Sequence, residues 1–158
     1  MLKIILTVVG VVVLGIVVYY GRYLFTEVVV NEAFPTVTVN PQVTASATPR
    51  PTKTGQFTEV DFIHKGSGQA LLYTDTDGKP LLRFEDFTIT NGPDLYVYLT
   101  KNSQPKDKAS LGEFINLGKL KGTVGNQNYS LENLPTGYNT VVIWCQRFSV
   151  LFSYAVLQ

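Results

Sequence analysis

The sequence predicts an all-β domain, an antiparallel β-sandwich or barrel, behind a single N-terminal transmembrane helix. An uncharged apolar run of 17 residues, Ile4 to Tyr20, opens the chain. Residues 56–158 consist of short apolar segments separated by turns rich in glycine, proline and asparagine. No part of this second region repeats apolar residues at helical spacing, so we expect strands there.

Residues 1–30 are predicted to form a signal-anchor, with a membrane span over about residues 3–21. A helix built from the uncharged run is about 25 Å long, close to the thickness of the hydrocarbon core. Tyr19, Tyr20 and Tyr23 stand where aromatic side chains gather at a membrane interface, and Lys3 and Arg22 flank the run. A helix buried in a protein core is the alternative, which the length of the run disfavours.

The end of the apolar run indicates that the anchor is not cleaved. It passes directly into tyrosine, glycine and arginine, without the small residues of a signal-peptidase site or a cysteine for lipid attachment. We therefore expect a single-pass protein of the cell membrane whose C-terminal domain lies outside the cytoplasm.

Residues 31–55 have the composition of a linker. Pro35, Pro41, Pro49 and Pro51 fall within this stretch, together with many threonines. Such a segment favours extended conformations and cannot form a core. It is interpreted as a stalk or as an ordinary flexible linker.

Residues 56–158 are predicted to form the β domain. Apolar segments between turn signals mark its strands, and the many aromatic residues provide a core of adequate size. We expect strands at Gln56–His64, Gln69–Tyr73, Leu81–Thr90, Leu95–Leu99, Phe114–Leu117, Asn128–Leu131, Tyr138–Phe148 and Phe152–Leu157.

Two glycine-containing motifs are interpreted as turns. The sequence Asp-Thr-Asp-Gly at 75–78 resembles part of a calcium loop but lacks its distal glutamate, so a hairpin turn is favoured. Gly118, Gly122 and Gly125 do not have the spacing of a dinucleotide-binding motif, and we interpret them as bulge or turn residues.

Charge and composition exclude several functions. The formal net charge is +1, which disfavours binding to nucleic acid. One cysteine and one histidine exclude zinc fingers, intramolecular disulfides, blue-copper sites and covalent c-type haem. A hydrolase would need His64 to meet Cys145 or a serine across the domain, which no motif indicates.

Cys145 is the candidate functional residue, and it has two interpretations. It lies in the apolar sequence TVVIWCQRF, where strand alternation places it on one face with Ile143 and Arg147 and turns Trp144 to the other. It is either a small core residue, as free cysteines often are, or a reactive thiol whose pKa Arg147 lowers.

Three segments of the β domain are distinctive: FEDFTITNGPDLYVYLT (84–100), LGKLKGTVGNQNYSL (117–131) and YNTVVIWCQRFSVLFSYAVL (138–157). They closely resemble the DM-thirteen domain family, which accompanies DOMON domains in animal Skeletor-type proteins and stands alone behind an anchor in bacteria. The segment GQFTEVDFIHKGSGQALLY (55–73) fits the family's opening pattern. The resemblance covers residues 55–158.

The resemblance implies a β-rich extracytoplasmic domain with a role in electron transfer, centred on a cysteine that maps to Cys145. It implies either a bare thiol or a ligand to a prosthetic group. Non-covalent haem bound through Cys145, with His64 as a weak second ligand, is compatible with the residue types. We expect a redox accessory domain, without catalytic activity of its own, that acts with a redox or cell-surface protein partner. The alternative is a non-catalytic surface binding or structural module in which Cys145 is only core.

Overall fold

The structure is a computed structural model that describes residues 2–35, 50–74 and 78–158. Within the N-terminal helix, side chains are described for residues 3–19 and 21. The long helix α1 (Leu2–Phe25) precedes the strands, and a short helix, α2 (Lys108–Leu111), lies among them. The strands of the described residues are β1 (Lys53–Gln56), β2 (Thr58–Glu59), β3 (Gly66–Thr74), β4 (Pro80–Ile89), β5 (Leu95–Thr100), β6 (Phe114–Lys119), β7 (Val124–Ser130), β8 (Thr140–Cys145) and β9 (Val150–Val156).

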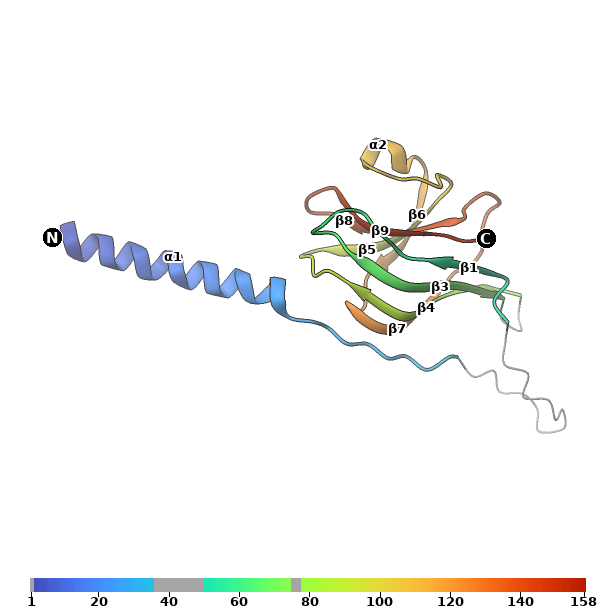
Figure 1. Ribbon diagram of the computed structural model, residues 1–158, viewed down its shortest axis with the longest axis horizontal. Coiled ribbons are helices and arrows are strands. Elements are labelled where there is room, and N and C mark those ends of the chain that lie inside the picture. The colour runs from blue at the N-terminus through green and yellow to red at the C-terminus, as the bar shows by residue number, and fades with distance from the viewer. Residues whose placement is uncertain (1, 36–49, 75–77) are drawn as a thin grey trace.

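The strands form a sandwich of two antiparallel sheets (Figure 1). One sheet has the order β1-β3-β4-β7 and the other the order β2-β9-β8-β5-β6. The two sheets meet at one corner, where Thr54 exchanges two backbone hydrogen bonds with Gln158. The predicted mostly-β fold is confirmed, and of the two architectures considered the sandwich forms while the closed barrel does not.

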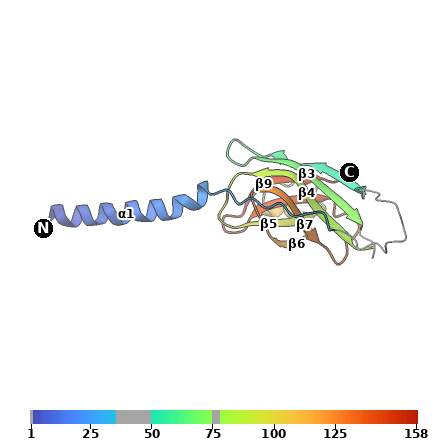
Figure 2. The same cartoon turned by 90° about the horizontal axis from the view of Figure 1, so that it is seen from below.

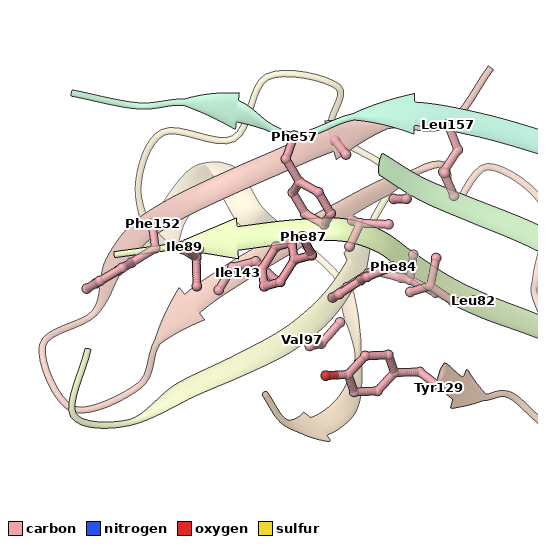
Figure 3. Close-up of a cluster of buried hydrophobic side chains, with 14 of the residues drawn as sticks. Phe57, Leu82, Phe84, Phe87, Ile89, Val97, Tyr129, Ile143, Phe152 and Leu157 are labelled. Atoms are coloured by element: carbon pink, nitrogen blue, oxygen red, sulfur yellow. The ribbon is translucent and has the colours of Figure 1, made fainter. Parts of the chain in front are cut away.

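The hydrophobic core lies between the two sheets (Figure 3). Phe57, which lies between β1 and β2, packs edge to face against Phe84 and Phe87 of β4, with ring centroids 4.9 and 4.8 Å apart. Such aromatic pairs contribute about 0.5–1.5 kcal/mol each beyond their buried area. The outer face of the five-stranded sheet has a smaller apolar cluster of its own, covered by Leu111 of α2.

Two of the predicted strands extend well beyond the strands in the structure. The stretch Gln56–His64 is not one strand, because β2 ends at Glu59 and Asp61 then accepts hydrogen bonds from the backbone of Ile63 and His64. These bonds close a loop of the kind that competes with a sheet. The stretch Tyr138–Phe148 is also too long, because β8 ends at Cys145 and a turn follows it.

Helix α2 was not expected in the β domain. It begins after Asp107, whose side chain accepts a hydrogen bond from the backbone of Ser110, while the Ser110 hydroxyl accepts from the backbone of Asp107. This reciprocal capping stabilises a single turn that has no apolar periodicity. The spacing of Asp107 and Ser110 was the only local signal for it in the sequence.

The glycines of the two motifs lie where the backbone turns or where it closely contacts another part of the chain. Strands β3 and β4 pair up to Thr74 and Pro80, as the hairpin prediction requires, although residues 75–77 lie outside the described residues. Gly118 and Gly125 have backbone φ angles of 100° and 105°, where residues with a side chain are strained. Gly122 and Gly125 also lie directly against the backbone of Val28 and Val30.

Helix α1 extends away from the sandwich (Figure 1 and Figure 2). Its described apolar side chains are exposed. Between Ile4 and Tyr19, its exposed large apolar side chains have exposed fractions from 51% at Ile16 to 69% at Ile4. Within the part of the chain that the structure describes, no helix combines the length and the hydropathy needed to cross a membrane.

The segment that follows α1 is bound to the edge of the sandwich. Val30 donates a backbone hydrogen bond to Val124 at 2.8 Å, and Glu32 donates one to Asn126 at 2.8 Å. Val29 and Val124 form a parallel bridge. Residues 28–32, which the sequence analysis divided between anchor and linker, therefore lie along the outer edge of β7 like an added strand.

Side chains reinforce this edge. Glu32 pairs with Lys121 at 2.8 Å, and its backbone carbonyl accepts a hydrogen bond from Arg83 at 3.1 Å. Phe34 packs edge to face on Tyr73, and the Arg83 guanidinium lies over the Phe34 ring. Although burial opposes it, the hydrogen bond from Lys121 and one from the backbone of Asn128 hold the pKa of Glu32 below its ordinary value.

We predict that Gly125→Ala loosens residues 28–32 from β7. The added methyl group would overlap the carbonyl of Val30, and the backbone strain at this φ costs about 1–3 kcal/mol of unfolding free energy. Hydrogen exchange at the Val30 amide should accelerate.

Gly118→Ala is the matched control, because Gly118 has nearly the same φ and no atom lies within 4 Å of the added methyl. It should lower the free energy of unfolding without selective loss of protection at Val30. Equal exchange at Val30 in both variants would show that the close contact at Gly125 does not hold the segment.

Candidate functional site

Cys145 is the last residue of β8, a strand in which all six residues are buried. Its own exposed fraction is 0%, and it belongs to the core between the sheets together with Ile143. Trp144 belongs to the cluster on the opposite face of the same sheet. The predicted alternation of Ile143, Trp144 and Cys145 is therefore confirmed.

Cys145 lies at the boundary between the core and a surface turn. It pairs with Leu95 at the start of β5 and with Val150 at the start of β9. The next residue, Gln146, is exposed, and its backbone N–H donates to the carbonyl of Asp94 at 3.0 Å. The thiol is therefore buried in the core, although the next residue along the chain is exposed to solvent.

Arg147 does not share a face with Cys145, so this prediction is wrong. Strand alternation ends with β8 at Cys145, and Arg147 lies in the exposed turn between β8 and β9. An exposed guanidinium interacts weakly with a buried thiol, because solvent screens its charge.

His64 lies in the β2–β3 loop, where its Nδ1 is 2.7 Å from Oδ2 of Asp61. Its ring packs edge to face on Phe152, with centroids 4.5 Å apart. Phe152 belongs to the same buried cluster as Cys145. His64 therefore contacts the cluster that contains Cys145 through Phe152.

Asp61 is the partner of His64 that the sequence analysis missed. The hydrogen bond with the His64 ring, and then the backbone N–H groups of His64 and Ile63, lower the pKa of Asp61 from 3.8 to about 2. The Asp-x-x-His spacing within a turn was the available signal. These hydrogen bonds hold the imidazole of His64 in place and order the β2–β3 loop that carries it.

A haem ligated by Cys145 does not fit this arrangement. The sulfur would need an open slot for the macrocycle, but Cys145 is fully buried among close-packed apolar side chains. Three clefts, with volumes of about 380, 180 and 480 Å³, are lined by other residues than Cys145 and His64. The described residues also contain no group of three or more histidine, cysteine or acidic side chains that could hold a metal ion.

The fold and the candidate site define a two-sheet β-sandwich whose single thiol is buried at one end of the core. The family model for electron transfer DM13 matches residues 56–157, and the chain belongs to this family. The family's description links it to electron transfer. Searches among curated proteins and among solved structures gave no match.

We predict that native Cys145 reacts with iodoacetamide much more slowly than Cys145 in denaturant. A fully buried sulfur reacts only through local opening of the structure. Phe148→Cys provides the control, because residue 148 is exposed in the adjacent turn and its thiol should be alkylated rapidly. Rapid alkylation of wild-type protein under native conditions would contradict the burial of Cys145.

We predict that the β2–β3 loop is stable to acid until Asp61 is protonated. The pKa of Asp61 is lower in the folded protein than in the unfolded chain, so the stabilisation is complete above pH 3.8 and is lost as the pH falls through about 2. The amide chemical shifts of Ile63 and His64 should report a transition near pH 2. Asp61→Asn, which keeps an acceptor oxygen but not the charge, should abolish it, and a wild-type transition at pH 4 would contradict the prediction.

Proposed function

We propose that this chain is a membrane-anchored electron-transfer accessory domain, displayed outside the cytoplasm, in which Cys145 is the redox centre. The observation that carries the proposal is the match to the electron transfer DM13 family over residues 56–157, a range that includes the only thiol of the chain.

The anchor is proposed to be α1. Its support is the uncharged run from Ile4 to Tyr20 and the apolar surface that the helix exposes instead of packing on the sandwich. An exposed apolar surface of this extent is typical of a segment that contacts a membrane or another protein. A single uncleaved anchor at the N-terminus is consistent with a β domain on the outer side of the membrane.

The chemistry of a single thiol determines how Cys145 exchanges electrons. The thiolate attacks one sulfur of a partner's disulfide, forming a mixed disulfide and releasing the other partner sulfur as a thiolate. One thiolate of a second protein, a dithiol donor, then attacks the Cys145 sulfur of the mixed disulfide and releases the first partner as a dithiol. The donor's other thiolate attacks the donor sulfur bound to Cys145, which frees the Cys145 thiolate and leaves the donor as a disulfide, so two electrons pass from the donor to the first partner. Because the chain has one cysteine, each direction of this exchange needs a dithiol or disulfide from another molecule.

The partner reaches the buried sulfur through the β8–β9 turn. This turn begins directly after Cys145 and consists of exposed residues 146–149. Separation of this turn from the β4–β5 loop would break the Gln146–Asp94 hydrogen bond and uncover the end of β8. Local opening of this kind makes exchange slow with any disulfide and fastest with partners that bind at this end of the sandwich.

The second candidate is a non-catalytic structural or binding module in which Cys145 is core. The observation that favours it is the complete burial of Cys145 among apolar side chains. In this case Cys145→Ala removes one sulfur from the core and costs on the order of 1 kcal/mol.

Mixed-disulfide formation by the full chain separates the two candidates. Purified wild-type protein and Cys145→Ala are incubated with an oxidised dithiol protein under native conditions, and adducts are measured by mass spectrometry. The redox proposal predicts an adduct in wild-type protein that a second dithiol protein resolves, and none in Cys145→Ala. The Phe148→Cys, Cys145→Ala double variant shows how fast an exposed thiol at the same end reacts. Absence of the wild-type adduct under conditions where this control reacts would support the structural module and contradict the redox role.

A further inference from the structure

Large apolar side chains are exposed at one end of the sandwich. Phe62 and Ile63 in the β2–β3 loop have exposed fractions of 85% and 53%, and Phe148 in the β8–β9 turn has 65%. Among the described residues of the β domain, Val60 in the same loop and Phe114 complete the set of exposed large apolar side chains. We call Phe62, Ile63 and Phe148 the apolar loop tips.

The backbone of the β2–β3 loop is held so that its tips point outward. Asp61 accepts hydrogen bonds from the backbone of Ile63 and His64 at 2.7 Å each, and Val60 donates to the carbonyl of His64 at 3.0 Å. His64 faces the core at Phe152, which leaves Phe62 and Ile63 on the outside of the loop. Phe62 and Ile63 are therefore part of an ordered loop rather than a loose one.

The β2–β3 loop and the β8–β9 turn, which carry the apolar loop tips, lie at the end of the sandwich that α1 enters (Figure 1). Glu27, two residues after the end of α1, lines a cleft with Lys65, which directly precedes β3, and with Ile89 at the end of β4. Val28 lines a second cleft with Gly92 and Asp94, and Asp94 accepts the hydrogen bond from Gln146 of the β8–β9 turn.

The connection between α1 and this end is short. Helix α1 ends at Phe25, and the Val28 backbone already donates a hydrogen bond to Thr123 at 3.0 Å. Three residue steps span at most about 10 Å. If α1 lies in a membrane, the sandwich cannot move far from the membrane surface.

We propose that the apolar loop tips insert into the interface of the same bilayer that holds α1, so that the Cys145 end of the sandwich faces the membrane. The inference rests on the proposed anchoring by α1. Aromatic and aliphatic side chains flanked by cations are typical of segments that bind a membrane interface. Exposed Lys65 follows His64 directly, and exposed Arg147 precedes Phe148.

The test uses the full chain reconstituted into phosphatidylcholine vesicles that contain lipids brominated either near the headgroup or deep in the acyl chain. Trp144 is replaced by phenylalanine, and one tryptophan is introduced at a time. Phe62→Trp and Phe148→Trp report on the tips. Phe114→Trp is the matched control, because Phe114 is an exposed phenylalanine that pairs with Thr100 at the opposite end of the sandwich. Leu14→Trp reports on α1.

Shallow brominated lipid should quench Phe62→Trp and Phe148→Trp several-fold more strongly than Phe114→Trp, and deep brominated lipid should quench Leu14→Trp. Quenching of Leu14→Trp without quenching of the tips would overturn this inference and leave the anchoring intact. A blue shift of the tip emission that depends on protein concentration, without quenching, would assign the tips to a second copy of the chain and overturn it. Absence of quenching at all four positions would overturn the anchoring and this inference together.

Discussion

The hydrogen bonds that tie residues 28–32 to β7 are the interaction on which the arrangement of the chain depends. Backbone groups of Val30 and Glu32 pair with Val124 and Asn126, and the Glu32 carboxylate pairs with Lys121. These contacts satisfy an edge strand that would otherwise present unpaired backbone groups. They also turn what would be a flexible tether into part of the sandwich, because Gly122 and Gly125 allow the two backbones to approach.

This pairing determines which end of the β domain faces α1. The strand ends at that side bring together the β2–β3 loop, the β4–β5 loop and the β8–β9 turn. Cys145 lies under the last of these, at the end of β8. In the proposed function, the thiol therefore exchanges electrons with a partner at or near the membrane, and the burial of the sulfur makes exchange fastest with partners that open the turn.

Local sequence patterns predicted the features that depend on residues close together in the chain. Strand alternation placed Cys145 and Ile143 on one face and Trp144 on the other, and turn residues placed most strands within a few positions. The binding of Val30 to Val124 joins residues far apart in the chain, and no periodicity in residues 28–34 indicates it. The position where β8 ends and the closing of the Asp61–His64 loop depend on strand register and on side-chain hydrogen bonds, which local patterns do not indicate. The sequence analysis therefore placed Arg147 and His64 in strands that do not extend to them.

The most direct test of the account is the mobility of residues 28–34 in the full chain, measured by ¹⁵N relaxation in lipid nanodiscs. If this segment is part of the sandwich, the backbone order parameters of Val30 and Glu32 should match those of β4 and β7, at about 0.85. A flexible linker would give values below about 0.6, which would contradict the fixed orientation of the Cys145 end relative to α1.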